Sequence, residues 1–147
     1  MSGKTYIAME GHAADAEDAI RSCGNELIRN GCVGSGFLTA CIDREKQFPT
    51  GLPTNIPVAI PHAASDEVFE TSVCVLRLDE GVRFQRMDDP SAFVDAKLIF
   101  NLAIKGHDAH LDFLQKLIGF MMDENHLTRC MELPINEIPH YLEETIK

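Results

Sequence analysis

The chain has 147 residues, of which 45% are hydrophobic and 24% are charged, a composition typical of a globular protein with its own core. No apolar run approaches the ~18 residues that a membrane-spanning helix needs, and the N-terminus lacks the basic and apolar blocks of a secretory signal. The formal net charge of −10 argues against nucleic acid as a general partner, because a phosphate backbone needs a basic footprint. We therefore expect one domain over residues 1–147, located in the cytoplasm, with no membrane insertion.

The cysteines indicate a reducing environment rather than a disulfide framework. They are an odd number, and none forms a C-x-x-C pair. We expect all of them to be small buried thiols; they are Cys23, Cys32, Cys41, Cys74 and Cys130.

Two helices are predicted in the first third of the chain. Apolar residues recur at helical spacing over 14–30, and Gly31 follows where a glycine commonly ends a helix. A turn at 34–36 leads to a second helix over 37–46, which carries Arg44 near its C-terminal end.

The middle of the chain is predicted to contain a stiff loop followed by strands. Residues 48–57 are rich in proline and glycine, which cannot lie inside helices or central strands without cost. Strands are then predicted at 58–60, 72–78, 82–84 and 96–104, with a turn at Gly81. The run AKLIFNLAI at 96–104 is nearly all apolar, as is typical of a strand covered on both faces.

Helices are predicted to return in the last third of the chain. Their ranges are 108–123, 125–131 and 135–146, with Asp108 available as a cap or first-turn acid for the first of them. Two helices, a group of strands and further helices together predict an α/β domain whose helices cover a mixed sheet.

Histidines are the main chemical inventory, and three of the six follow predicted strands. His62 follows the strand at 58–60, and His107 and His110 follow the strand at 96–104, one helical turn apart. Ligand and active sites of α/β proteins gather at strand ends. One interpretation is a zinc site, because three neutral imidazoles make a good catalytic ligand set.

The other interpretation makes His62 a nucleophile in phosphoryl transfer. A phosphoryl group on one ring nitrogen leaves the other as a donor that a backbone carbonyl can orient, and an imidazole with a pKa of ~6.5 is mostly neutral at neutral pH. His110 and Arg44 are candidates for neutralising the phosphate oxygens. Pro61 fixes the backbone before His62 and small residues follow it, so we expect an uncovered His62 on a shallow, mostly apolar docking surface.

Three stretches resemble a known family. I-P-V-A-I-P-H-A at 56–63, preceded by R-E-K-Q-F-P-T-G-L at 44–52, is similar to the active-site region of the fructose/mannitol-type enzyme IIA domains of the bacterial phosphotransferase system (PTS). H-D-A-H-L-D-F-L at 107–114 is similar to that family's H-L-x-x-L helix start. The resemblance implies that His110 supports the phosphorylated histidine, with His107 as an alternative. F-P-T-G-L is most similar to the galactitol-type branch.

The resemblance also implies a fold and a function. The fold is an α/β sandwich around a mainly five-stranded mixed sheet. His62 would accept a phosphoryl group from the carrier HPr and pass it to a cysteine of the cognate enzyme IIB, before enzyme IIC transports and phosphorylates the sugar. Arg44 matches the family's phosphate-stabilising arginine.

We expect a free-standing phosphotransferase subunit that uses no cofactor or metal. Two alternatives stay open. One is a regulatory relative that acts by phosphorylation-dependent protein binding, and the other is a zinc hydrolase built on the histidine cluster.

Overall fold

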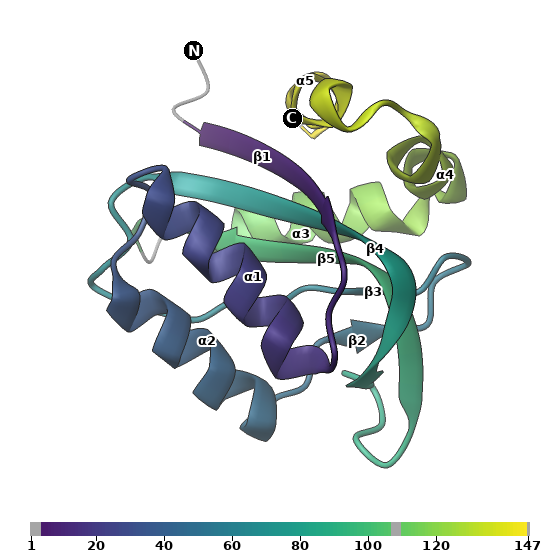
Figure 1. Cartoon of the computed structure of the whole chain (residues 1–147), viewed down its shortest axis with the longest axis horizontal. Coiled ribbons are helices and arrows are strands. Elements are labelled where there is room, and N and C mark those ends of the chain that lie inside the picture. Colours follow the sequence, from purple (N-terminus) through teal and green to yellow (C-terminus); the bar gives the residue numbers. More distant parts are fainter. Residues whose placement is uncertain (1–3, 107–109, 147) are drawn as a thin grey trace.

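A mixed sheet forms the centre of the molecule (Figure 1). The computed structural model describes residues 4–106 and 110–146, apart from the side chain of His110. Within these residues five strands lie in the order β1-β4-β5-β3-β2. The β1–β4 and β3–β5 pairs are parallel, and the β4–β5 and β2–β3 pairs are antiparallel. The strands are β1 (Lys4–Gly11), β2 (Gly51–Leu52), β3 (Val58–Ala59), β4 (Thr71–Gln85) and β5 (Phe93–Ala103).

Helices cover both faces of this sheet (Figure 1). One face is covered by α1 (Ala16–Arg29) and α2 (Ser35–Gln47). The other is covered by α3 (His110–Met122), α4 (Glu124–Glu132), the short 3-10 helix η1 (Ile135–Glu137) and α5 (Ile138–Thr145). No helix in the described part of the chain is long and apolar enough to cross a membrane. The predicted α/β class with a five-stranded mixed sheet is confirmed.

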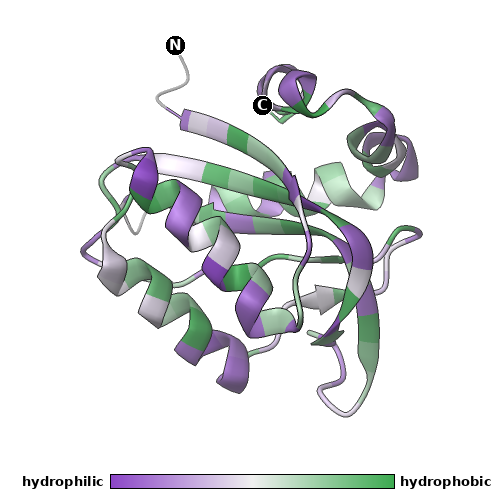
Figure 2. Ribbon diagram, viewed as in Figure 1, coloured by the Kyte–Doolittle hydropathy of each residue, from purple (hydrophilic) through white to green (hydrophobic). Residues whose placement is uncertain are grey.

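The core divides into two clusters, one on each face of the sheet. Alternate residues of β4 point to opposite sides, so that Cys74 and Leu76 face α1 and α2 while Val73 and Val75 face the C-terminal helices. The run at 96–104 is likewise buried on both faces, as predicted. Hydrophilic residues lie on the outer faces of α1 and α2 (Figure 2). All five cysteines are buried free thiols, as expected.

The first two helices begin and end close to their predicted limits. The side chain of Asp15 caps α1 by accepting a hydrogen bond of 2.8 Å from the backbone N–H of Asp18. Gly31, at φ 75°, takes the left-handed conformation that glycine adopts at low cost after a helix. The predicted turn at 34–36 is wrong in part, because α2 already begins at Ser35 and includes Gly36.

One prediction about strands is also wrong, and one strand was missed. The turn expected at Gly81 is a shift of register within one long strand, β4, which pairs with β5 on both sides of it. An irregularity of this kind bends a strand without ending it. The edge strand β1 was not predicted, because its residues are almost all only half-buried and lack a strong apolar pattern.

Candidate functional site

The backbone around His62 is fixed to the central sheet. The carbonyl oxygen of Pro61 accepts hydrogen bonds from the backbone N–H of Leu102, at 2.9 Å, and from the side-chain amide of Asn101, at 3.0 Å. His62 itself forms a parallel bridge with Leu102. Because Asn101 is fully buried in β5, the residue before His62 is held by a rigid part of the fold.

The ring of His62 has a defined orientation. Nδ1 lies 2.6 Å from the carbonyl oxygen of Ile60, and Nε2 lies 3.5 Å from Nη2 of Arg44. A carbonyl can only accept a hydrogen bond and a guanidinium can only donate. We therefore assign the proton to Nδ1, which leaves the lone pair of Nε2 on the side of Arg44.

Arg44 is held in place by its own helix end. Its guanidinium lies 5.0 Å from the centre of the Phe48 ring, a distance that allows a cation–π contact. The backbone N–H of Phe48 donates to the carbonyl of Arg44 at 2.7 Å and so closes the last turn of α2. Phe48 is 57% exposed and Arg44 is partly exposed, whereas His62 is buried.

The next residue of α2, Glu45, binds the loop that leads to β2. Its Oε2 accepts from the backbone N–H of Thr50 at 2.8 Å, and its Oε1 accepts from the Thr50 hydroxyl at 2.7 Å. Burial raises the pKa of Glu45, while the hydrogen bonds from Thr50 and the charge of Arg44 act in the opposite direction. The sequence shows this glutamate, but it gives no sign of its partner.

The glycine of F-P-T-G-L is required by close packing. A Cβ on Gly51 would lie 2.7 Å from the backbone oxygen of Gln85. The carbonyl of Gly51 also accepts a hydrogen bond from the backbone N–H of Met87 at 2.8 Å. The loop therefore lies directly against the end of β4.

A pocket of about 350 Å³ has His62 in its wall. Its other lining residues come from three separate stretches of the chain, and they are Arg44, Gln47, Phe48, Pro49, Thr50, Met87, Pro90, Leu114 and Ile118. The expectation of an uncovered His62 is wrong, since the residue is only 5% exposed. The backbone of His62 is bridged to Leu102 of β5, and its ring forms a hydrogen bond with the carbonyl of Ile60. Both contacts keep the residue buried.

The two other histidines of the predicted cluster fall where side chains are not described. His107 lies outside the described residues. His110 begins α3, but its side chain is also outside the description. The helix that it begins contributes Leu114 and Ile118 to the pocket beside His62. Among the described residues, no group of three or more His, Cys, Asp or Glu could hold a metal ion.

The sequence matches a family model over residues 2–142. The model describes the phosphoenolpyruvate-dependent sugar phosphotransferase system, EIIA 2. The chain belongs to this family. The EIIA resemblance drawn from the motifs around His62 and His110 is therefore confirmed, and with it the class of phosphotransferase components.

Relatives of this EIIA chain carry names for two sugars. It is 33% identical over 130 residues to the mannitol-specific EIICBA component of Escherichia coli K12, a match that covers 86% of this chain and 19% of that protein. The chain thus spans about a fifth of that relative. It is 27% identical over 128 residues to the galactitol-specific EIIA component of the same strain, covering 86% of this chain and 85% of that one.

A solved structure supports the fold of the EIIA chain. The chain resembles a chain in the complex of enzyme IIA and phosphorylated enzyme IIB for mannitol from Escherichia coli, with a TM-score of 0.76 and 28% identity. The match covers 95% of this chain and 94% of that one. The enzyme IIA fructose/mannitol-type fold is confirmed.

Proposed function

We propose that this chain is a phosphocarrier in which Nε2 of His62 accepts a phosphoryl group from phosphorylated HPr. The chain then passes the group to a cysteine of its cognate enzyme IIB, which serves sugar uptake through enzyme IIC. The observation that carries the proposal is the orientation of the His62 ring, with Nδ1 toward the Ile60 carbonyl and Nε2 toward Arg44. The names of the relatives favour a sugar alcohol, mannitol or galactitol, as the sugar.

The ring geometry suits both steps of this transfer. In the first step the lone pair of Nε2 attacks phosphorus, and the P–N bond to the histidine of HPr breaks with its electron pair returning to that imidazole. The proton on Nδ1 stays in place and donates to the carbonyl of Ile60, which stabilises the positive charge on the phosphorylated ring. In the second step a cysteine thiolate of enzyme IIB attacks phosphorus, and the electron pair returns to Nε2.

Arg44 supplies positive charge where the phosphate oxygens arrive. Its Nη2 lies 3.5 Å from Nε2, so donors of the guanidinium are within reach of a phosphoryl group bound there. The contact with the ring of Phe48 holds the side chain in this position before the partner arrives. His110, from the start of α3, is proposed as the second supporting residue on the strength of its family motif.

The surface around the pocket suits protein partners. Phe48 and Met87 are 57% and 41% exposed, and both line the pocket with Leu114 and Ile118 of α3. Exposed apolar residues beside a buried reactive group are typical of a docking surface. The similar Escherichia coli enzyme IIA was solved in complex with phosphorylated enzyme IIB, which supports a complex of this kind. We place this exchange in the cytoplasm.

The test is phosphorylation of the purified protein by phosphoenolpyruvate, enzyme I and HPr, followed by intact mass. The wild type should gain one acid-labile phosphoryl group, and His62→Ala should gain none. Addition of the cognate enzyme IIB should then discharge the wild-type protein. Failure of the wild type to gain mass beside an active HPr would overturn the proposal, whereas charging without discharge would favour the regulatory alternative.

A further inference from the structure

We propose that Glu45 is a positioning residue for the phosphoryl transfer and sets the orientation of the His62 ring through Thr50. This inference rests on the proposed function of His62 for its kinetic consequence. Its structural part, the control of the ring by Glu45, concerns the unphosphorylated protein and can be measured without any partner.

A continuous series of hydrogen bonds joins the two side chains. The carboxylate of Glu45 accepts from the N–H and the hydroxyl of Thr50, at 2.8 and 2.7 Å. The carbonyl of Thr50 accepts from the backbone N–H of Ile60 at 3.3 Å. The carbonyl of Ile60 in turn accepts from Nδ1 of His62 at 2.6 Å. The position of the last carbonyl therefore depends on where Glu45 holds Thr50.

The contact between Thr50 and Ile60 continues the pairing of β2 with β3. Gly51 pairs with Ala59 and Leu52 with Val58, so Thr50 lies one step further along the same antiparallel ladder. These strands have only two residues each, and a pair this short has little stability of its own. The two hydrogen bonds from Thr50 to Glu45 therefore fix this end of the ladder, which the short strands alone would not do.

The adjacency of Arg44 and Glu45 links this anchor to the phosphate-binding group. Both side chains come from the last turns of α2, one directed to Nε2 of His62 and the other to Thr50, whose carbonyl binds the backbone of Ile60. One helix end thus sets both nitrogens of the ring. This arrangement favours a role in aligning the nucleophile, because near-attack geometry is sensitive to displacements of about 1 Å.

The position of Glu45 also fits a functional group better than a stabilising one. The carboxylate is largely removed from water, and burial raises its pKa. Its hydrogen-bond partner among the described residues is the uncharged Thr50. A desolvated carboxylate that holds a neutral partner contributes little net stability, which suggests that its value lies in orientation.

The experiment compares Glu45→Gln and Thr50→Val with the wild type. The first replaces one acceptor oxygen by an amide, and the second removes the hydroxyl while keeping the side-chain shape. Thr50→Ser restores a hydroxyl and serves as the rescue variant. The matched control is Glu26→Gln, which removes a partly exposed carboxylate that binds Arg29 on α1 and does not line the pocket.

The primary measurement is the tautomer of the His62 ring, from ¹H–¹⁵N correlation of its two nitrogens in unphosphorylated protein. We expect the proton on Nδ1 in the wild type and in Glu26→Gln, and a shift toward Nε2–H in Glu45→Gln and Thr50→Val, with most of the shift reversed in Thr50→Ser. The kcat of transfer from phosphorylated HPr should fall about tenfold in the first two variants, the loss expected from one misplaced hydrogen bond. The KM should stay unchanged, because Thr50 is buried and Glu45 does not line the pocket, so neither side chain lies on the surface that a partner contacts.

Unchanged tautomer and kcat in a folded Glu45→Gln protein would overturn the inference. If that variant fails to fold, the same outcome in Thr50→Val overturns it. A shifted tautomer in a chain whose wild type takes no phosphoryl group from HPr would uphold the control of the His62 ring by Glu45 and refute the proposed function. The two failures are therefore distinguishable.

Discussion

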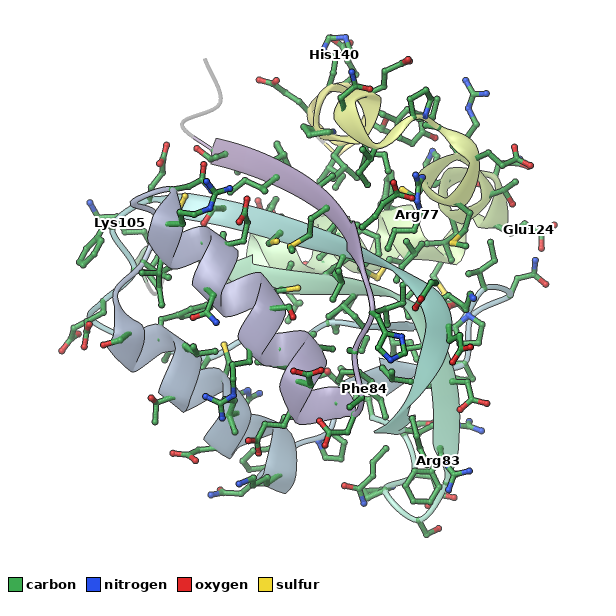
Figure 3. The ribbon with its side chains drawn as sticks, viewed as in Figure 1. Arg77, Arg83, Phe84, Lys105, Glu124 and His140 are labelled. Atoms are coloured by element: carbon green, nitrogen blue, oxygen red, sulfur yellow. The ribbon has the colours of Figure 1, made fainter. Side chains whose placement is uncertain are left out.

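Two arginines of this chain, Arg77 and Arg44, differ in what their guanidinium groups contact. Arg77 points from β4 toward α4, and its side chain is only 12% exposed (Figure 3). Its Nη2 donates to the carboxylate of Glu10 in β1 at 3.0 Å. Its Nη1 donates to three backbone carbonyls at the end of α4, those of Cys130, Met131 and Leu133, at 3.0, 3.3 and 2.7 Å.

Arg44 uses its guanidinium in a different way. Among residues 4–106 and 111–146, the Arg44 guanidinium contacts one nitrogen of His62 and the ring of Phe48. These contacts use only a few of its five N–H donors. The surroundings of the guanidinium, and not its burial alone, therefore distinguish the two arginines. A guanidinium surrounded by carbonyls that end a helix belongs to the fold, whereas one that lines a pocket keeps donors for an incoming anion.

Arg44→Lys should have the largest effect on transfer of all the variants that test this difference between the two arginines. An ammonium keeps the charge but not the planar set of donors, so the rate of transfer from phosphorylated HPr should fall by about 10²-fold. The free energy of unfolding should change by no more than about 0.5 kcal/mol. Single-turnover transfer followed by mass spectrometry and a urea melt measure the two effects. A wild-type transfer rate in Arg44→Lys would contradict the phosphate-binding role of Arg44.

Arg77→Met should show the reverse pattern. The substitution leaves three carbonyls of the α4 end and the carboxylate of Glu10 without their donor, so the free energy of unfolding should fall by about 2–3 kcal/mol. The folded fraction should transfer phosphoryl groups at the wild-type rate. Arg29→Met, which breaks an exposed contact with Glu26 on α1, is the control and should cost less than about 1 kcal/mol. Equal losses in the two variants would contradict the structural role of Arg77.

Gly51→Ala tests whether the pocket depends on the fold beneath it. The new methyl group would lie 2.7 Å from the backbone oxygen of Gln85 and 3.0 Å from Val94, so the loop must shift away from β4. We expect a loss of about 1–2 kcal/mol in a urea melt. Transfer should slow as well, because the loop carries Thr50. Wild-type stability in Gly51→Ala would show that the backbone at the end of β4 can shift to accept the methyl group at little cost.

The smallest expected effect is the pH dependence that Glu45 gives to stability. Because its pKa is raised in the folded protein, the folded state keeps the proton to higher pH than the unfolded chain does. The contribution to stability is therefore present below the ordinary carboxyl pKa and is lost as pH rises through the raised value. The charged residues that line a groove with Glu45 are Asp15, Glu17, Lys46 and Arg83.

The difference in the free energy of unfolding between wild type and Glu45→Gln isolates this contribution. Groups common to the two proteins largely cancel, including carboxyls with lowered pKa values such as Asp79. We expect the wild type to lose stability relative to the variant as pH rises above about 4.5. A difference that stays constant, or that changes in the opposite direction, would contradict the assigned shift.

The sequence predicted those elements whose burial leaves a strong pattern. The helix at 14–30 and the strand at 96–104 are buried along a continuous face or on both faces, so their apolar residues follow the geometry closely. The strand β1 is half-buried at the edge of the sheet, so its sequence mixes polar and apolar residues and shows no clear apolar pattern. Gly81 predicted a turn because the sequence does not show that β5 pairs with both halves of β4.

The sequence indicated two residues that lie close together, whose roles stay a prediction, but it did not indicate how deeply they are buried. The motifs identified His62 and Arg44, which the structure brings together at 3.5 Å. They did not predict that His62 is buried, since this follows from its bridge to Leu102, about forty residues later in the chain. The clamp between Glu45 and Thr50 was missed for the same kind of reason, because a hydrogen bond between a helix end and a loop has no compositional signature.

The size of the pocket has a kinetic consequence for the proposed exchange. Both carriers must reach the same nitrogen through a space of about 350 Å³, which favours one incoming side chain at a time. The two half-reactions then alternate in a ping-pong sequence. Under the proposed function, an excess of unphosphorylated HPr would compete with enzyme IIB for the charged protein and return the phosphoryl group to its source. The flux toward the sugar would then follow the ratio of the two carriers more than the concentration of either one.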